Sequence, residues 1–314
     1  MKIKLFTHND LDGVGAGVVA KHAFGENVDV EYCGYDSIDS KVAEFLISPE
    51  FDETDAIFIT DISVKEEALI KLINYKAKDK LMLIDHHKTA EHLNQYSWAK
   101  VSDTEVNYKN NDASPRLSSG TSAFYFYLVE SGLLEPTPEL RDFVEQVRSW
   151  DTWDWTRTNP RNEQAMLLNL LLTVIGRWKF VERFSANAEV VFNATERTIV
   201  DIEKNRIDYT IKTKQKALIE RELVLPIGVY KVGVVFAENY VSDVGNALAE
   251  SNPHLDFIIT VINGNKLSFR GIEKGIDLGL VAKEFGGGGH PLAAGASLEE
   301  DTLNKVFDLI LNKE

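Results

Sequence analysis

The chain has 314 residues, of which 44% are hydrophobic and 26% charged, and its formal net charge is −15 at pH 7. This composition is typical of a globular protein with a sizeable core, and the length predicts two domains. The charge excludes a protein that coats long duplex nucleic acid, because an acidic surface repels long polyanions. Cys33 is the one cysteine, which excludes an intrachain disulfide and a cysteine-based zinc site.

Strand-like and helix-like runs alternate over the first 100 residues. The apolar runs predict strands at 2–7, 28–33, 56–60 and 81–84, and the spacing of apolar residues predicts helices at 14–23 and 65–76. This order is typical of a doubly wound, mostly parallel sheet with helices on both faces, so we expect an α/β fold. The polar pair His8 and Asn9 follows the N-terminus too closely for a signal peptide, and the longest apolar stretch is too short to span a bilayer. We therefore expect a cytoplasmic protein without membrane contact.

The second half changes from helices to strands. Ser119 caps a predicted helix that runs to about residue 131, and 138–222 is mainly helical, ending in a charged helix over 196–222 that serves as a connector. After Pro226, strands are predicted at 229–236, 257–262 and 266–271, with a helix at 243–250 and a hairpin turn at 263–265. These patterns predict a catalytic domain (1–190), a helical linker (191–225) and a smaller C-terminal α/β domain (226–314).

Acidic and histidine residues gather directly after three of the predicted strands. The carboxyl ends of parallel strands share one edge of a sheet, where ligands bind, so we expect the three groups to converge. Each group alone is explained by ordinary structure, Asp61 for example as the N-cap of the following helix, but three aligned groups are not. The residues are His8, Asp10 and Asp12, then Asp61, and then Asp85, His86 and His87.

Carboxylates and imidazoles without thiolates are the ligands of Mn²⁺ and similar divalent ions. A carboxylate that bridges two such ions forms a centre that activates water and binds a phosphate group. The sequence therefore predicts phosphoester chemistry at this edge of the sheet.

These motifs resemble those of the DHH phosphoesterase superfamily, which includes RecJ exonucleases, family II pyrophosphatases and phosphodiesterases that degrade very short RNA. The resemblance continues in the C-terminal region, where Phe269-Arg270-Gly271, the run from Gly286 to Pro291 and Ala293-Ala294-Gly295 are similar to its Gly-rich associated domain. It covers nearly the whole chain, and the short opening motif is most similar to the members that act on very short RNA.

The resemblance implies a role for each residue of the three groups. His8 and Asp10 hold one metal ion, Asp12 and His86 hold the other, and Asp61 bridges both. It further implies that His87 faces the substrate as electrophile or proton donor, and that Asp85 orients a ligand histidine. The two ions are expected to be Mn²⁺, with Mg²⁺ or Co²⁺ as substitutes.

A further aspartate is expected to complete the second metal site. The stretch 149–155 offers Asp151 and Asp154, and we prefer Asp151 because it ends a helical run before a polar turn. The tryptophans at 150, 153 and 155 are able to stack on bases, but their spacing favours packing in the core.

The glycine run predicts a ligand-binding loop. We interpret Gly286, Gly287, Gly288 and Gly289 as a segment that packing does not require and whose backbone amides approach a phosphate closely. His290 adds a donor, and Arg270 is able to contact a phosphate in two places or stack on a base.

These observations predict a dinuclear, Mn-dependent phosphodiesterase or phosphatase, in which a metal-bridged hydroxide attacks phosphorus in short RNA or in a small nucleotide such as 3′-phosphoadenosine 5′-phosphate. Two alternatives stay open within the fold: an exopolyphosphatase or cyclic-nucleotide phosphodiesterase, and a non-catalytic nucleotide sensor. We also expect that two copies of the chain form a homodimer.

Overall fold

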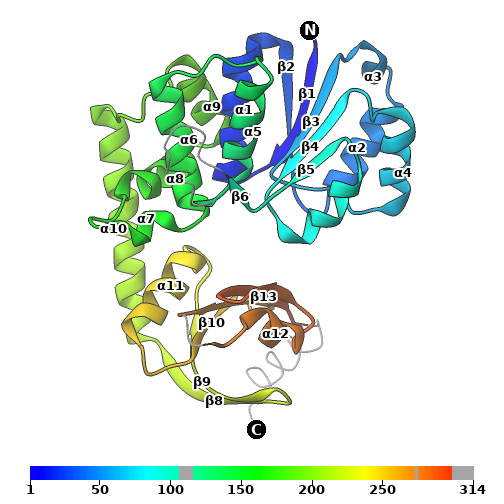
Figure 1. The fold of residues 1–314 in the computed structure, drawn as a ribbon. Helices are drawn as coiled ribbons and strands as arrows, with labels where there is room; N and C mark the ends of the chain where they lie inside the picture. Colours follow the sequence, from blue (N-terminus) through cyan, green and yellow to red (C-terminus); the bar gives the residue numbers. More distant parts are fainter. Residues whose placement is uncertain (106–115, 273–274, 299–314) are drawn as a thin grey trace. The chain divides into compact units, whose positions relative to one another are not determined.

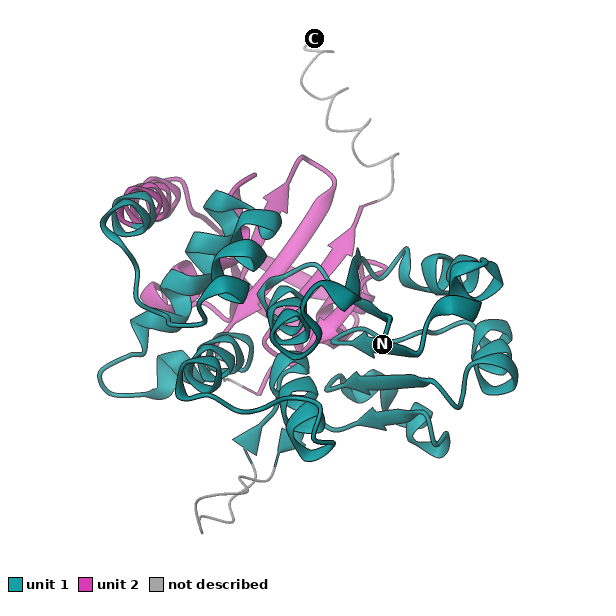
Figure 2. Ribbon diagram, turned by 90° about the horizontal axis from the view of Figure 1, so that it is seen from above, with its two compact units in different colours: residues 1–200 teal, residues 201–314 magenta. Residues whose placement is uncertain are grey.

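The computed structural model describes residues 1–105, 116–272 and 275–298. The chain divides into two compact units, Met1–Val200 and Asp201–Glu314, which Figure 2 colours separately. Among the helices of the described residues, none combines the length and the apolar character that a membrane span requires. The division into a catalytic domain, a linker and a substrate-binding domain stays a prediction.

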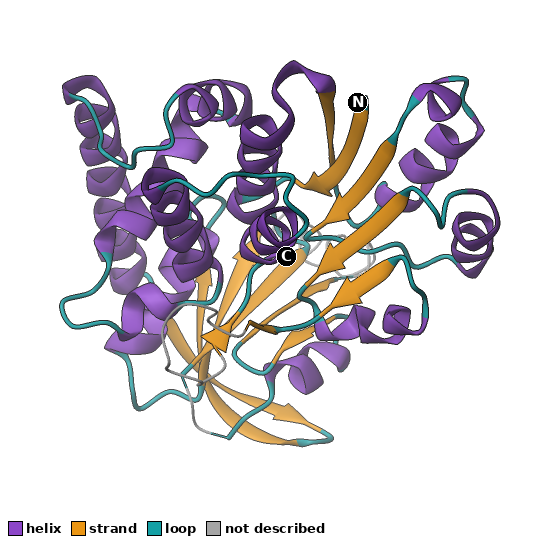
Figure 3. Cartoon of the chain, turned by 45° about the horizontal axis from the view of Figure 1, so that its top comes forward, coloured by secondary structure: helices purple, strands orange, loops and turns teal. Residues whose placement is uncertain are grey.

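Five parallel strands form the sheet of the first unit, in the order β2-β1-β3-β4-β5. The strands are β1 (Ile3–His8), β2 (Val28–Cys33), β3 (Ala56–Thr60), β4 (Leu81–Asp85) and β5 (Ala99–Val101). Helices α1 (Leu11–Phe24) and α5 (Gly120–Glu130) cover one face, and α2 (Ile38–Ile47) and α4 (Glu67–Lys76) cover the other (Figures 1 and 3). This confirms the predicted doubly wound α/β fold, in which buried central strands are continuous apolar runs.

The strand order reverses at β1, because β2 lies on one side of it and β3 on the other. Ligands bind at such a switch point, beyond the carboxyl ends of the strands. The turn from β1 into α1 is tight there: a Cβ on Gly13 would lie 2.1 Å from the backbone oxygen of His8. The glycine therefore lets α1 begin immediately after the strand, with Asp10 as its N-cap.

Several helices complete the first unit beyond the sheet. Ser119 caps α5 as predicted, in a reciprocal pair of hydrogen bonds with Ser122. Thr137 caps α6, with Pro138 at its first turn. The remaining elements are α3 (Glu50–Glu53), α6 (Pro138–Asp151), α7 (Asp154–Arg157), α8 (Glu163–Ile175), α9 (Arg177–Ala186), the 3₁₀ helices Gly25–Asn27 and Lys88–Gln95, and the short pair β6 (Thr104–Glu105) and β7 (Arg116–Leu117).

Helix α10 (Ala194–Lys216) begins in the first unit and continues in the second. The prediction of a helix over 196–222 is wrong at its end, because Ile219–Leu225 forms strand β8 of the second sheet. This strand is an exposed edge strand rich in charged residues, so its composition is similar to that of an exposed helix.

The second unit is a six-stranded sheet in the order β12-β13-β11-β10-β9-β8. Strands β9 and β10 are parallel and the other pairs are antiparallel, and the predicted turn at 263–265 joins β10 to β11. Its elements, besides β8, are β9 (Gly228–Phe236), α11 (Val241–Ser251), β10 (Phe257–Ile262), β11 (Lys266–Gly271), α12 (Leu278–Lys283), β12 (Gly288–His290) and β13 (Ala293–Ser297). This confirms a smaller C-terminal α/β unit.

Candidate metal centre

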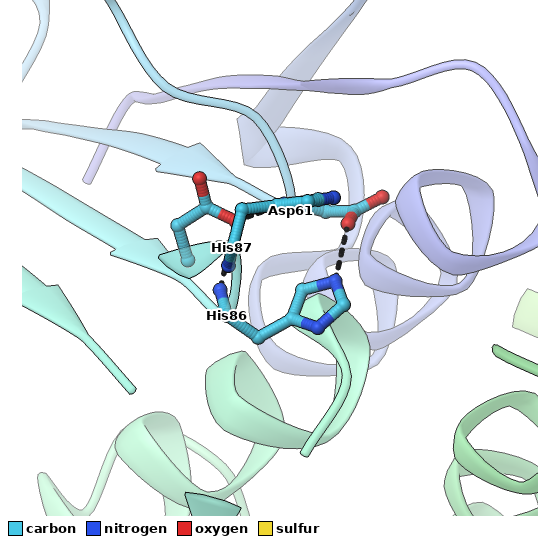
Figure 4. Close-up of side chains that lie close together, drawn as sticks. Asp61, His86 and His87 are labelled. Carbon is cyan, nitrogen blue, oxygen red and sulfur yellow. Dashed lines mark hydrogen bonds and ion pairs between the residues drawn. The ribbon is translucent and has the colours of Figure 1, made fainter. Parts of the chain in front are cut away.

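Asp61 lies at the middle of the site, directly after β3 at the switch point. The Oδ1 atom of Asp61 is 3.2 Å from Nε2 of His86, and its Oδ2 atom is 3.9 Å from Nδ1 of His8. Figure 4 shows the ring of His86 turned toward the Asp61 carboxylate. The two oxygens of one carboxylate thus face ligand-type nitrogens from two different strands.

The backbone of Asp61 excludes its interpretation as an ordinary helix cap. Its φ is 57°, in the left-handed region that non-glycine residues rarely adopt, and the next helix begins only at Glu67. Such strain of roughly 1–3 kcal/mol persists where the surrounding structure imposes it, which is common at functional sites. The side chain is 2% exposed, and its Oδ2 atom is buried without a hydrogen bond.

Two groups of three ligand-type residues lie around this carboxylate. In each group the potential ligand atoms are within 4.8 Å of one another. The predicted partners of each metal therefore lie together, although their role as ligands stays a prediction. The groups are His8, Asp10 and Asp61, and Asp12, His86 and Asp151.

The structure separates the two candidates for the fourth motif. Asp151 ends α6, and its Oδ2 atom is 3.7 Å from Nε2 of His86. Asp154 instead forms an ion pair of 2.7 Å with the buried Arg148, which holds the turn after α6. The arrangement favours Asp151 as a ligand and gives Asp154 a structural role.

The N-terminus of α5 binds Asp12, a contact that the sequence did not predict. The backbone N–H groups of Gly120 and Thr121 donate to the Asp12 carboxylate at 2.5 and 2.9 Å. A Cβ on Gly120 would lie 2.3 Å from Cβ of Asp61, so only glycine fits between the helix and Asp61. The pattern Ser119-Gly120-Thr121 offered a helix cap or a lining of the crevice, and the cap was preferred because proximity to the site depends on the tertiary fold.

The carboxylates of the site repel one another strongly. Burial, and then the negative charges of Asp12 and Asp10, raise the pKa values of Asp61 and Asp151. The side chain of Asp10 is 52% exposed; desolvation by its neighbours opposes its ionisation, but the hydrogen bond and charge of His8 outweigh this and lower the pKa of Asp10. Crowded, buried carboxylates with an unpartnered oxygen fit a site for divalent cations, which neutralise this repulsion.

His87 is oriented by a chain of hydrogen bonds at the end of β4. Its Nδ1 atom is 2.7 Å from Oδ1 of Asp85, whose other oxygen accepts from Ser63 at 2.5 Å. Asp85 was expected to orient a ligand histidine, but its side chain contacts the ring of His87 and only the backbone N–H of His86. Burial alone would lower the pKa of His87, and the bond and charge of Asp85 raise it instead.

Tyr35 is a further residue of this site that the sequence analysis missed. It follows β2, and its hydroxyl is 3.3 Å from Nε2 of His87. No motif marks it, because it comes from a loop whose position is set by the neighbouring strands.

The glycine run and Arg270 line one pocket of about 610 Å³ in the second unit. The guanidinium of Arg270 donates to the hydroxyls of Ser268 and Ser242, which fix its direction. His290 is exposed and is not among the lining residues. The lining residues are Ile262, Lys266, Leu267, Ser268, Arg270, Gly286, Gly287, Gly288, Gly289 and the strand segment 293–297.

The expectation that packing does not require these glycines is wrong for two of them. A Cβ on Gly287 would lie 2.1 Å from the backbone oxygen of Gly295, and one on Gly289 would lie 2.6 Å from Cα of Ala294. Gly286 has a φ of 73°, which favours glycine, whereas a Cβ on Gly288 would meet open space. The close approach of the run to β13 therefore explains Gly287 and Gly289.

The tryptophans form a cluster after α6. Their ring centroids are 5.5 to 6.0 Å apart, and Trp153 is 43% exposed. The three rings therefore pack against one another, as a partly solvent-exposed cluster, and not in the centre of the core.

Comparisons with known proteins match one family domain within the first unit and another within the second. The DHH family, N-terminal domain, matches residues 2–145, and the DHHA1 domain matches residues 241–313. Oligoribonuclease NrnB of Bacillus subtilis (strain 168) is 39% identical, over 98% of this chain and 74% of the relative. The chain belongs to the DHH family.

Solved structures of this family share the fold. Exonuclease RecJ bound to manganese is 14% identical with a TM-score of 0.56, over 97% of this chain and 87% of that one. The pGpG-specific phosphodiesterase PggH of Vibrio cholerae is 13% identical with a TM-score of 0.50, over 99% and 98% of the two chains. Family membership, together with the clustered ligands, makes the protein a metal-dependent phosphoesterase.

Proposed function

We propose that this phosphoesterase hydrolyses short RNA oligonucleotides, with small nucleotides such as 3′-phosphoadenosine 5′-phosphate as further substrates. The observation that carries the proposal is the Asp61 carboxylate, whose two oxygens face the His8 group and the His86 group. The similarity to a relative named as an oligoribonuclease supports the substrate class.

The donor set fits two divalent cations, and we propose Mn²⁺. Oxygen and imidazole donors without thiolates suit this ion. His8 and Asp10 would hold one cation, Asp12, His86 and Asp151 the other, with Asp61 shared. When bound, the pair supplies Lewis-acid stabilisation of phosphoryl oxygens and an activated water.

The protein's own side chains orient the reaction around that pair. Asp85 holds His87 through Nδ1, so Nε2 is directed away from Asp85 and toward the Tyr35 hydroxyl. We propose that Nε2 exchanges this contact for a phosphoryl oxygen or the leaving oxygen when substrate binds. The raised pKa of His87 favours its protonated form, which suits a proton donor. The amides at the start of α5 hold Asp12 at a fixed position beside His86.

The pocket of the second unit supports a nucleotide over a simple phosphate substrate. Its volume of about 610 Å³ is large enough for a nucleotide, and Arg270 offers a fixed, charged donor for a phosphate or a face for a base. Pyrophosphate has no group that needs such a pocket.

A turnover panel in Mn²⁺ tests the proposal. We expect di- to penta-ribonucleotides to be hydrolysed with the highest kcat/KM, followed by the bisphosphate nucleotide, and pyrophosphate, polyphosphate and cyclic nucleotides to be poor substrates. Preferred turnover of polyphosphate or cyclic nucleotides would replace this proposal by the corresponding alternative. Nucleotide binding in Mn²⁺ without any turnover would indicate a sensor. Mg²⁺ and Co²⁺ in the same panel test the preference for Mn²⁺.

A cytoplasmic location and a homodimer stay predictions. Cell fractionation tests the first. Light scattering on the purified chain tests the second.

A further inference from the structure

Tyr35 is held at the mouth of the metal centre by a closed turn after β2. The backbone N–H of Ser37 donates to the carbonyl of Gly34 at 3.0 Å, and the Ser37 hydroxyl accepts from the N–H of Gly34 at 3.0 Å. These bonds fix the turn between β2 and α2. Tyr35 is 48% exposed, so its side chain is accessible to a ligand.

Two histidines of the site contact this tyrosine. The ring centroid of Tyr35 is 4.8 Å from that of His8, and its hydroxyl is 3.3 Å from Nε2 of His87. The Tyr35 hydroxyl is a neutral phenol at pH 7 and is therefore a hydrogen-bond donor. Asp85 contacts Nδ1 of His87, so a substrate would have to approach the ring from the Nε2 side, where the Tyr35 hydroxyl lies.

A lysine stands beside the tyrosine ring. The Nζ atom of Lys65 is 5.0 Å from the ring centroid of Tyr35, and its backbone N–H donates to Asp39 at 2.9 Å, which ties its loop to α2. Within the part of the chain that the structure describes, the ammonium of Lys65 forms no salt bridge.

The net charge of the metal-loaded centre determines whether a nearby lysine is needed to attract an anionic substrate. The two groups of ligand-type residues contain the four carboxylates of Asp10, Asp12, Asp61 and Asp151, whose charge two divalent cations cancel. A metal-loaded centre thus has little net charge to attract an anionic phosphoryl group. In a chain of net charge −15, an unpaired ammonium at the mouth provides that attraction.

We propose that Tyr35 and Lys65 form a phosphoryl-binding subsite of the hydrolytic centre. The Tyr35 hydroxyl and Nε2 of His87 donate to the phosphoryl group that is hydrolysed, and the Lys65 ammonium attracts it. This inference rests on the proposed function, because it takes a phosphoester as the ligand. It adds two residues that the family motifs in this chain do not contain.

Inorganic phosphate titrated into the metal-loaded protein is the direct test. In Tyr35→Phe, which keeps the ring on His8, we expect Kd for phosphate to rise about 10-fold, the loss typical of one hydrogen bond to a charged group. Metal content should equal that of the wild type. Tyr75→Phe is the matched control, because Tyr75 is 87% exposed on α4 and should bind phosphate like the wild type.

The lysine is tested in the same titration. Lys65→Met should weaken phosphate binding several-fold and reduce its dependence on salt. Lys71→Met is the control, since it removes the same charge from α4, where Lys71 pairs with Glu67.

A second arm measures hydrolysis of an RNA dinucleotide. Tyr35→Phe should lower kcat about 10²- to 10³-fold, as loss of one transition-state donor does. Wild-type affinity for phosphate in Tyr35→Phe would overturn the subsite even if RNA is hydrolysed. Tyr35-dependent phosphate binding without RNA turnover would support the subsite and overturn the proposed substrate.

Discussion

Asp61 combines three unfavourable features in the metal-free protein: a left-handed backbone, complete burial and an oxygen without a hydrogen bond. Its pKa is raised, so its ionised form destabilises the fold, and this destabilisation grows as pH rises above the unfolded pKa. The proposed bridging role requires an ionised carboxylate at this position, and bound cations would offset its effect on stability.

Asp61→Asn should therefore raise the Tm of the metal-free protein at neutral pH, by about 2–4 °C for each kcal/mol relieved. Asparagine tolerates the left-handed backbone, so the substitution isolates the charge. The same variant should lose most of the rise in Tm that Mn²⁺ gives the wild type. Thermal melts with and without Mn²⁺ measure both effects, with the exposed Asp52→Asn as control. A full Mn²⁺ effect in Asp61→Asn would contradict the bridging role.

His86 and His87 are neighbours with different surroundings, and their substitutions should differ accordingly. His86→Ala should reduce the number of metal ions bound, because Nε2 of His86 faces Asp12, Asp61 and Asp151. His87→Ala should keep the metal and slow turnover by about 10²- to 10⁴-fold, as loss of a proton donor does. Metal analysis and kcat on a dinucleotide separate the two roles. If His87→Ala loses metal and His86→Ala does not, the two roles are the reverse of those proposed.

At the scale of elements, strands β1 to β4 of the first sheet were predictable because each is a short apolar or alternating run between polar turns, whereas the three-residue strand β5 was missed. The residues that end three of these strands were predictable as a group for the same reason. Tyr35, Gly120 and Ser63 were not, because each reaches the site from a loop or helix start whose position only the folded chain defines. Strand β8 was mistaken for helix because its exposed charged residues have no apolar period to distinguish them.

The pairing of β12 with β13 makes a sharp prediction for the glycine run. Gly287→Ala should destabilise the second unit by about 1–3 kcal/mol, since its Cβ would overlap the backbone of β13. Gly288→Ala should leave stability unchanged, because its Cβ meets open space. Denaturant unfolding of the two variants compares them at adjacent positions. Equal free energies of unfolding for the two variants would show that the glycine run does not pack against β13.

At the scale of the whole molecule, we expect the net charge of −15 to limit substrate length. In the proposed function, the cations neutralise the charge around the scissile phosphate, and the pocket of Arg270 and the glycine run takes one further phosphate or base. Each added nucleotide beyond those contacts brings repulsion. We expect kcat/KM to fall from two to about twenty nucleotides, and moderate salt to reduce the fall by screening. Constant or rising kcat/KM would indicate a processive exonuclease.

The central claim is that Asp61 is a ligand shared by the two metal sites of a phosphoesterase centre. Hydrolysis of an RNA dinucleotide by the wild type and by Asp61→Asn tests this claim most directly. The measurement follows product formation while Mn²⁺ is titrated into chelator-treated protein. The account predicts no turnover without metal, turnover that saturates with Mn²⁺ in the wild type, and a loss of about 10³-fold or more in Asp61→Asn. Turnover in the presence of chelator, or an Asp61→Asn rate equal to that of the wild type, would contradict it.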